Sequence, residues 1–309
     1  MTLRMRSSPL LTTAAACLSA LVAACGGGGG GGGAAVPVAC STTNQKQFVL
    51  DVTRDWYLFQ NDLPASVNIG DYPTAQELLD ALTATARAQG KDRFFSYLTT
   101  PGADSSFLLE GQYIGFGFRT SIQTDRLLLP DVYEGSPADL GGLVRGAEIT
   151  AIDSGSGYVP MATILATDSN LEQAFGPATA GVQRGLRFLL PGAGQTTDAV
   201  FTKATVTIPP VPTGGAVILP LPSNPLVPAV GYINLRTFIS TAEAPLRSAY
   251  AQFRAQGIRN FIVDFRYNGG GLVSVGGDVA SYAAGSGGSG QYFARLFYND
   301  KRSYNNQDF

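Results

Sequence analysis

The sequence predicts a multi-domain α+β protein, in which an N-terminal helical segment, a β-rich domain and an incomplete α/β part of βαβ order follow one another. Three observations support this fold class. Apolar residues recur at helical spacing between residues 42 and 105. Short alternating runs separated by turns fill residues 106–211. Strand-like and helix-like runs then alternate over residues 212–309.

The composition limits the chemistry open to the chain. It has 309 residues, a formal net charge of −2, 14% charged residues and no histidine. Nucleic-acid binding needs a basic surface, so we expect no nucleic-acid partner. The lack of histidine excludes a Ser-His-Asp triad, a Cys-His pair and a His-ligated metal within these residues. We expect no metal and no other cofactor.

Residues 1–24 have the pattern of a signal peptide, because Arg4 and Arg6 precede an apolar run that is short for a membrane span. Its end, LVAAC, resembles the bacterial lipobox, which implies cleavage before Cys25 and lipidation of its thiol. An ordinary secretory signal with an incidental cysteine is the alternative. Residues 25–41 contain a glycine run, which predicts a flexible tether. We expect a lipid anchor in the bacterial cell envelope, facing the periplasm. An aspartate directly after the lipidated cysteine would suggest retention in the inner membrane. Gly26 stands there instead, so the outer membrane is favoured.

Residues 42–105 are the predicted N-terminal helical domain. In QKQFVLDVTRDWYLF, Phe48, Val52 and Trp56 recur at helical spacing, with Val49 and Leu50 beside them. Trp56 and Tyr57 are expected to pack in the core. In DYPTAQELLDALTATARAQ, Thr74 is expected to cap a second helix, and the leucines of residues 78–82 form its apolar face.

Residues 106–211 are the predicted β-rich domain, and YIGFGF near its start is the first candidate site. Glycines alternate there with large apolar residues, so backbone N–H groups can face outward while the rings anchor the loop. Such a nest suits the carboxylate at the end of a peptide, and the adjacent strand edge can pair with the peptide. An ordinary glycine-containing strand is the alternative. The candidate peptide-binding residues in this stretch are Tyr113, Ile114, Gly115, Phe116, Gly117 and Phe118.

The sequence that follows, VYEGSPADLGGLVRGAEITAID, supports peptide binding. Ser136 and Pro137 are expected to start a short helix, which precedes a strand over residues 148–152. Together with YIGFGF, this stretch resembles a PDZ domain of the bacterial protease type, although Ala147 and the glutamate after it depart from the usual pattern. The resemblance implies a groove whose other wall is the helix around residues 171–175, which makes Leu171 a further candidate peptide-binding residue. It also implies polypeptides with free C-termini as partners.

The second candidate site is a glycine turn in the α/β part, which follows a predicted linker over residues 209–228. The stretch FIVDFRYNGGGLVSVGGDVASYAA begins with an apolar strand, turns on three glycines and continues as a helix. The strand is expected to be parallel to its neighbour and buried on both faces. N–H groups at a helix start attract a phosphate, a carboxylate or a reaction oxyanion. A dinucleotide site is disfavoured, because NGGGLVSVGG lacks the G-x-G-x-x-G spacing and GSGGSG follows no strand. A turn that needs glycine only for steric reasons is a further alternative.

VDFRYNGGG resembles the DLR-x-N-x-GG signature of the carboxyl-terminal processing proteases, the tail-specific or tricorn-core-like serine peptidases. GYINLRTF, the upstream PDZ-like domain, and DWYLFQNDLP with FFSYL match the order of elements in that family. The resemblance implies a partial peptidase core over residues 212–309, and a Ser nucleophile with a Lys base. It also implies an oxyanion held by the N–H groups of Gly270 and Gly271. Asp264 and Arg266 are expected to form a structural pair that positions the turn.

No motif of the family's nucleophile type occurs before Phe309. We therefore expect no catalytic residue in this chain and a Ser-Lys dyad downstream of it. The parent protein is expected to be a serine-type endopeptidase that recognises polypeptide C-termini through its PDZ groove, while residues 1–309 by themselves are inactive. The alternative is a non-catalytic, lipid-anchored peptide-binding protein.

Overall fold

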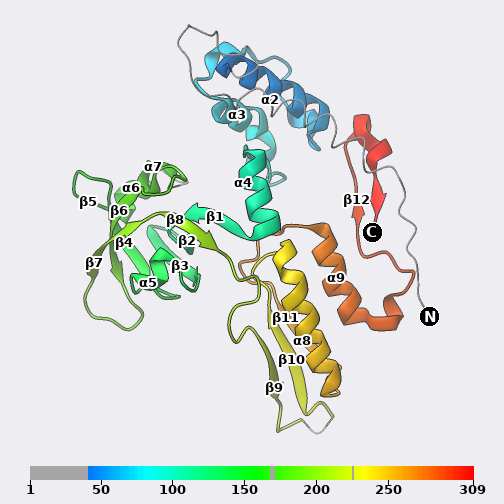
Figure 1. Ribbon diagram of the computed structural model, residues 1–309. Helices are drawn as coiled ribbons and strands as arrows, with labels where there is room; N and C mark the ends of the chain where they lie inside the picture. Colours follow the sequence, from blue (N-terminus) through cyan, green and yellow to red (C-terminus); the bar gives the residue numbers. More distant parts are fainter. Residues whose placement is uncertain (1–40, 168–170, 225) are drawn as a thin grey trace, which may run out of the picture. The chain divides into compact units, whose positions relative to one another are not determined.

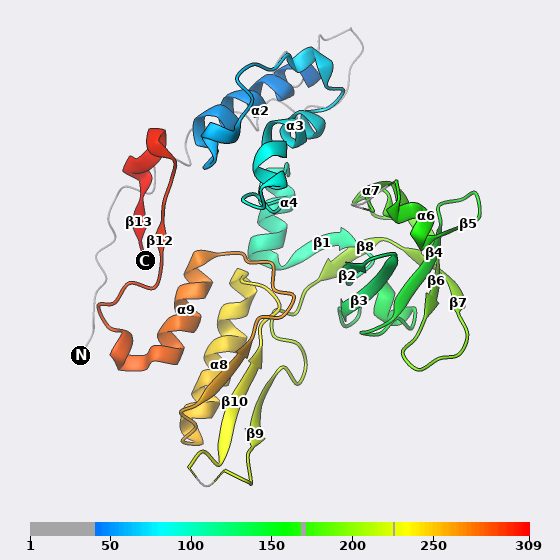
Figure 2. The same cartoon turned by 180° about the vertical axis from the view of Figure 1, so that it is seen from behind.

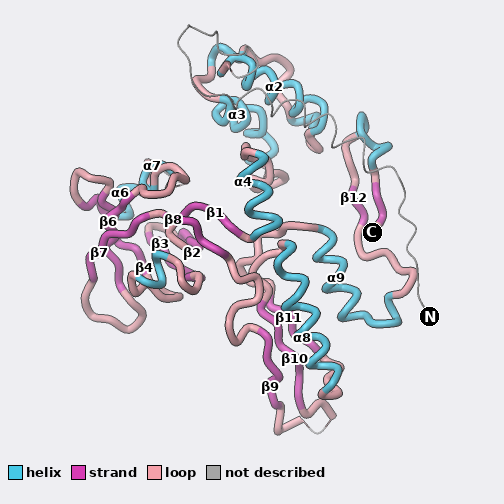
Figure 3. Tube along the Cα trace, in the orientation of Figure 1, coloured by secondary structure: helices cyan, strands magenta, loops and turns pink. Residues whose placement is uncertain are grey.

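The computed structural model describes residues 41–167, 171–224 and 226–309. These residues form two compact units, one made of residues 41–98 with 296–307 and the other of residues 99–295 with 308–309. Figure 1 labels the helices and strands, and Figure 3 colours the same trace by secondary structure. The predicted signal peptide, Cys25 and the glycine run lie outside the described residues.

The first unit is built on two helices, α2 (Thr42–Trp56) and α3 (Ala75–Ala88), with short turns η2 (Gln60–Asp62), η3 (Ile69–Asp71) and η7 (Asp300–Asn305). Its core consists of Val49, Leu50, Leu78, Leu79 and Leu82.

The apolar face of α2 was predicted only in part. Val49 and Leu50 are buried, and so is Tyr57, as expected. Phe48, Val52 and Trp56 lie on the exposed side, and Trp56 is 44% exposed rather than packed in the core. Two neighbouring apolar stripes run along this helix. The stripe that includes Val49 and Leu50 packs against α3, so the other stripe faces away.

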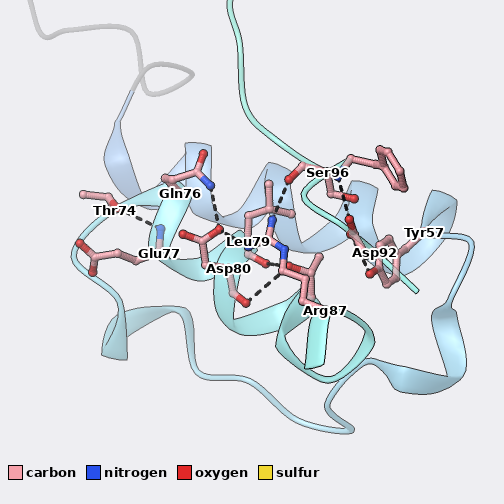
Figure 4. Close-up of polar contacts among 11 residues, drawn as sticks. Tyr57, Thr74, Gln76, Glu77, Leu79, Asp80, Arg87, Asp92 and Ser96 are labelled. Carbon is pink, nitrogen blue, oxygen red and sulfur yellow. Dashed lines mark hydrogen bonds and ion pairs between the residues drawn. The ribbon is translucent and has the colours of Figure 1, made fainter. Parts of the chain in front are cut away.

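Local hydrogen bonds fix the ends of these helices and the loop after α3. As predicted, the Thr74 hydroxyl accepts the N–H of Glu77 at the start of α3 (Figure 4). Farther along, the Tyr57 hydroxyl donates to the buried Asp92 carboxylate over 2.9 Å. Burial raises the pKa of Asp92, but hydrogen bonds from Ser96, Tyr57 and the backbone of Phe95 outweigh it and leave the pKa below its usual value.

The second unit begins with α4 (Pro101–Ser105) and η4 (Ser106–Glu110), and its β-rich part follows. The strands are β1 (Gln112–Gly115), β2 (Phe118–Gln123), β3 (Arg126–Val132), β4 (Glu148–Asp153), β5 (Tyr158–Pro160), β6 (Gln183–Leu189), β7 (Thr197–Thr202) and β8 (Ala204–Thr207). The main sheet has the order β2-β3-β4-β6-β7, and β5 pairs with β4. Strands β1 and β8 pair separately and antiparallel.

Short helices cover this sheet: α5 (Pro137–Leu140), α6 (Met161–Leu165) and α7 (Glu172–Phe175). Ser136 caps α5, as predicted, by accepting the N–H of Asp139. YIGFGF and AVFTKATVTI both have the alternating pattern of a strand, but each is interrupted, the first at Phe116 and Gly117 and the second at Lys203. TDSNLEQAF predicts a helix that Thr167 or Asp168 caps. Asp168 lies outside the described residues, and α7 begins at Glu172.

The α/β part contains β9 (Ala216–Pro220), β10 (Ala229–Asn234), η5 (Ser240–Ala242), α8 (Glu243–Ala255), β11 (Phe261–Asp264) and α9 (Val273–Ala284). β10 and β11 are parallel, as predicted. The predicted linker over residues 209–228 contains β9, which pairs antiparallel with β10. Figure 2 shows α8 lying along this sheet. The remaining elements are η6 (Gly285–Gly288), β12 (Arg295–Leu296) and β13 (Gln307–Asp308).

The prediction that β11 is buried on both faces was wrong for the described residues. The sheet order is β11-β10-β9, so β11 lies at an edge. Its Ile262 side chain is 49% exposed. The other face packs into the core, where Ile233 of β10 meets Leu246 and Phe253 of α8.

Candidate functional site

The glycine turn between β11 and α9 is folded tightly against the segment that follows β10. Gly270 and Gly271 have φ values of +108° and +134°, which L-residues with a side chain rarely adopt. A Cβ atom on Gly271 would lie 2.1 Å from the carbonyl oxygen of Phe238. The Phe238 N–H donates to the Gly270 carbonyl over 3.0 Å, and the Leu272 N–H donates to the Phe238 carbonyl over 2.6 Å. The turn therefore needs glycine both for its φ values and for this close backbone approach.

The two predicted oxyanion donors differ in their hydrogen bonds. The N–H of Gly270 donates to the Asn268 side-chain oxygen over 2.8 Å, and the Asn268 amide in turn donates to the Leu235 carbonyl. The N–H of Gly271 has no acceptor among the described residues. No side chain caps the start of α9, which follows directly. One free N–H group at a helix start is thus available for an anion.

Asp264 and Arg266 form the ion pair that the sequence predicted. The Arg266 guanidinium donates to both carboxylate oxygens of Asp264, and the Tyr232 hydroxyl adds a hydrogen bond of 2.7 Å. Asp264 is buried, and its carboxylate also accepts the Arg266 N–H. The Arg266 side chain, followed by Tyr232, holds the pKa of Asp264 well below its usual range against the opposing effect of burial. The pair fixes the chain as it leaves β11.

The predicted peptide-binding loop leads into an open sheet edge. β2 is the first strand of its sheet, so its outer edge has no partner strand among the described residues. Phe118 is in register with Val132, and the Tyr133 N–H donates to the Gly117 carbonyl over 2.8 Å. In this type of antiparallel pair, the N–H and C=O of Phe118 point away from β3. They therefore face the open edge, where a peptide strand can add.

Gly117 is the residue of this loop that tolerates no side chain. Its φ is +97°, and a Cβ atom would lie 2.0 Å from the Cβ atom of Ser136. The Ser136 hydroxyl donates to the Gly117 carbonyl over 3.2 Å, so the start of α5 holds the loop in place. Gly115 is restricted differently, because the ring of Tyr113 lies 2.4 Å from the position of its missing Cβ atom.

Not all of the predicted peptide-binding residues lie at the open edge. Tyr113 and Ile114 belong to β1 and are in register with Val206 and Thr205 of β8. Burial raises the pKa of Tyr113 above its usual value. The structure brings Phe116, Gly117 and Phe118 together at the edge. Leu171 is buried in the core beneath them, next to α7.

Strands β2 and β3 are connected to the glycine turn by residues that the sequence analysis did not identify. Arg236 follows β10, and its guanidinium is paired with Asp131 over 2.8 Å and with Glu134 over 2.7 Å. Arg119 of β2 donates to the Arg236 carbonyl over 3.2 Å. The next residue, Thr237, donates to the Gly270 carbonyl over 3.1 Å. These partners are separated by many residues, so no local pattern could have revealed them.

The described residues contain no group of three or more His, Cys, Asp or Glu side chains that could hold a metal ion. Within the same residues, no helix combines the length and the apolar character that crossing a membrane requires.

Two regions of the chain match known families. Residues 44–97 match the family described as Peptidase S41 N-terminal domain. Residues 229–308, which include the glycine turn, match Peptidase family S41.

Several proteins are similar to longer stretches. The chloroplastic Carboxyl-terminal-processing peptidase 3 of Arabidopsis thaliana is 27% identical over 199 residues, which are 60% of this chain and 36% of that protein. The Carboxyl-terminal-processing protease of Synechocystis sp. is 30% identical over 172 residues, or 55% of this chain and 37% of that protein. This chain thus spans about a third of the length of these curated relatives. The crystal structure of an S41 protease from Bacteroides fragilis gives a TM-score of 0.52 at 24% identity, covering 84% of this chain and 65% of that chain, so the fold is shared.

Proposed function

Because this chain belongs to peptidase family S41, we propose that the full-length protein is a serine-type endopeptidase that recognises the C-termini of polypeptides. The edge of β2 captures the free C-terminus, and the glycine turn holds the oxyanion formed during cleavage. The observation that carries this proposal is the free N–H of Gly271 at the start of α9, within the region that matches the family.

Capture of a C-terminus needs backbone groups and an anion site, and the loop at β2 offers both. The outward N–H and C=O of Phe118 extend the sheet to a peptide strand. The glycine-containing loop before Phe118 turns its backbone toward the end of that strand, where the terminal carboxylate lies. An amidated peptide keeps the strand pairing but loses the negative charge, so it binds more weakly.

Cleavage requires a nucleophile and a base, which a Ser-Lys dyad beyond Phe309 supplies in the full-length protein. The neutral lysine takes the serine proton, and the serine oxygen bonds to the scissile carbonyl carbon. The negative charge moves to the carbonyl oxygen, which accepts the Gly271 N–H. The Gly270 N–H joins only if it leaves Asn268, its present acceptor.

The proposed capture of C-termini is tested with labelled ten-residue peptides that end in alanine, either as the free acid or as the amide. Fluorescence anisotropy measures their affinity for the purified chain. We expect the free acid to bind at least tenfold more tightly than the amide, a difference of about 1.4 kcal/mol. Equal affinities would show that the carboxylate is not recognised. This comparison uses the unmodified protein, so it does not depend on whether a variant folds.

Gly117→Val extends the test to the loop itself. We expect it to abolish binding of the free acid, because the new side chain collides with Ser136. The matched control is Gly192→Val, which changes another glycine of positive φ where nothing lies within 4 Å of the missing Cβ atom. In the full-length protein, cleavage of a reporter that carries the same tail tests the endopeptidase. Binding without cleavage would support the non-catalytic peptide-binding alternative.

The lipid anchor at Cys25 belongs to this proposal as well. It rests on LVAAC and on the glycine run that follows it. Lipidation tethers the protein to the cell envelope, where secreted polypeptides are its substrates. Metabolic labelling with a fatty acid should mark the wild-type protein, whereas Cys25→Ala should lose the label and release the protein from the membrane fraction.

A further inference from the structure

The exposed stripe of α2 and the loop after α3 line one apolar groove of about 550 Å³ in the first unit. The stretches DWYLFQNDLP and FFSYL, which lie far apart in the sequence, both contribute to it. We call it the aromatic groove, and its large exposed side chains include Phe48, Val52, Trp56, Leu58, Phe95 and Tyr97. Phe48, Phe95 and Tyr97 are 65%, 67% and 64% exposed. Soluble proteins rarely leave a large apolar patch uncovered, so the aromatic groove is a candidate docking surface.

Hydrogen bonds hold the loop of the aromatic groove with its rings outward. The buried Asp92 carboxylate accepts the Phe95 N–H over 2.9 Å. Arg87 donates to the Ser96 carbonyl over 2.8 Å (Figure 4). Phe94, at the start of the loop, has a φ of +63°, which an aromatic residue rarely adopts. The loop thus carries backbone strain while its rings stay exposed, and such strain is typical of functional sites.

Basic side chains lie over the rings of this surface. The guanidinium carbon lies 4.5 Å from the ring centre for Arg87 on Phe94, 6.0 Å for Arg93 on Phe95 and 4.4 Å for Arg302 on Trp56. Arg93 is exposed and has no acidic partner among the described residues. Asp92 is the only acidic residue that lines the groove, and it already accepts the Tyr57 hydroxyl. Aromatic rings beside basic side chains are typical of surfaces that bind where a bilayer with anionic lipids meets water.

The proposed lipid attachment brings the aromatic groove within reach of a bilayer. Cys25 precedes Thr42, the first residue of α2, by 17 residues. A segment of that length spans at most about 60 Å in any conformation. Because the attached lipid and the groove belong to one chain, their encounter with the same membrane is intramolecular, and a weak intrinsic affinity is sufficient for docking.

We propose that the aromatic groove docks on the bilayer that holds the lipid anchor, with its rings among the headgroups and Arg93 facing the lipid phosphates. This rests on the proposed lipidation of Cys25. A tether alone leaves the first unit free to rotate, whereas docking turns one fixed face toward the membrane. A second copy of the chain is the competing occupant, and the test separates the two.

Trp56 reports on docking directly, because it is the single tryptophan of the chain and lines the aromatic groove. The mature chain from Cys25 onward, made without its lipid, is titrated with vesicles of phosphatidylethanolamine and phosphatidylglycerol. We expect the Trp56 emission to shift to shorter wavelength. Lipids with bromine atoms in their acyl chains should quench it, since bromine quenches only at close approach.

Variants of the exposed rings test which surface binds. Phe95→Ala combined with Tyr97→Ala should lower the affinity for these vesicles at least tenfold, and it should leave the fold intact because both rings are exposed. Arg93→Gln should lower it about fivefold, and only when phosphatidylglycerol is present. The matched control is Tyr292→Ala in the second unit, which removes a ring that is 67% exposed and lies 5.0 Å from the Arg295 guanidinium carbon. It should keep the wild-type affinity.

Three results would overturn the inference. The first is a wild-type chain that binds no vesicles, or that binds them without quenching of Trp56. The second is a folded double variant that keeps the wild-type affinity. The third is a wild-type chain that dimerises without vesicles while the double variant stays monomeric in analytical ultracentrifugation, because a second copy then covers the groove.

The lipid anchor is read separately, from the labelling of Cys25 with a fatty acid in cells. Labelling without vesicle binding by the mature chain refutes docking and leaves the anchor in place. Vesicle binding by a chain that is not labelled at Cys25 refutes the anchor and supports the aromatic groove as a membrane surface.

Discussion

The three glycines of the turn after β11 make different demands on the structure, and alanine substitutions can separate them. Gly269 does not have a positive φ, and its missing Cβ atom has only an Arg119 nitrogen nearby, at 4.0 Å. Gly270 has a φ of +108° but open space around the missing Cβ atom. Gly271 has a φ of +134° and the Phe238 carbonyl oxygen 2.1 Å away. Alanine at position 269 therefore adds neither effect, alanine at position 270 adds backbone strain, and alanine at position 271 adds both strain and a collision with Phe238.

The expected losses of stability follow from this geometry. Gly269→Ala should be close to neutral. Gly270→Ala should lose about 1–3 kcal/mol, the usual cost of an L-residue in an unfavourable backbone region. Gly271→Ala has the same strain and must also separate the turn from Phe238, which breaks two backbone hydrogen bonds. At about 1 kcal/mol each, they make Gly271→Ala about 2 kcal/mol worse than Gly270→Ala.

Hydrogen exchange measured by mass spectrometry is the appropriate assay. The single tryptophan, Trp56, lies in the first unit and does not report on this turn. Exchange in peptides from β10 and α9 gives the free energy of opening for the part that contains the turn. Equal values for Gly270→Ala and Gly271→Ala would refute the argument, because the contact with Phe238 would then not constrain the turn.

Three further predictions concern stability. The pKa of Asp92 is lower in the folded state, so the first unit should lose stability below about pH 4 as Asp92 takes up a proton. Asp92→Asn should reduce this loss, because the charged acceptor of Tyr57 is gone. Urea titrations followed by Trp56 fluorescence measure the effect. Arg236→Met should lower the free energy of unfolding of the second unit by about 2 kcal/mol, below the value for a fully buried pair because one of its two acidic partners is partly exposed. Thr74→Ala should cost the first unit about 1 kcal/mol by removing the cap of α3.

Each of these predictions has a control on the same chain. Asp51→Asn changes an exposed carboxylate of α2 and should leave the acid transition of the first unit unchanged. Arg187→Met removes an exposed pair with Asp198 and should change stability less than Arg236→Met does. For the cap, Thr74→Ser keeps the hydroxyl and should retain most of the stability. An acid transition unaltered by Asp92→Asn, or equal losses for the two arginine variants, would contradict the reasoning.

Much of the fold could be predicted because its signals are local. Thr74 and Ser136 cap the helices expected of them, since a cap depends on residues within one turn. The strand predicted at EITAID is β4, and the parallel pair of β10 and β11 follows from the helix between two apolar runs. The glycine turn was placed correctly because only glycine suits its backbone.

The features that the sequence did not predict depend on contacts between distant residues. Either of two apolar stripes of α2 could have been buried, and packing against α3 selected Val49 and Leu50. The sequence did not predict β9, because it lies in a stretch rich in proline and glycine. It forms a strand because it pairs with the edge of β10. In the candidate site, the acceptor for the Gly270 N–H is an asparagine two residues away, yet that side chain is oriented by Leu235.

By itself, the sequence determined the order of the three parts, the caps of the main helices, the glycines that the two candidate sites need, and the family. These properties depend on short stretches of sequence, because backbone preferences and the spacing of apolar side chains act over a few neighbouring residues. Only the tertiary structure decided that Arg236 pairs with Asp131 while the next residue, Thr237, bonds to Gly270, and that Phe175 packs against Phe116 and Phe118. These contacts depend on how strands and helices pack in three dimensions, because their partners lie far apart along the chain.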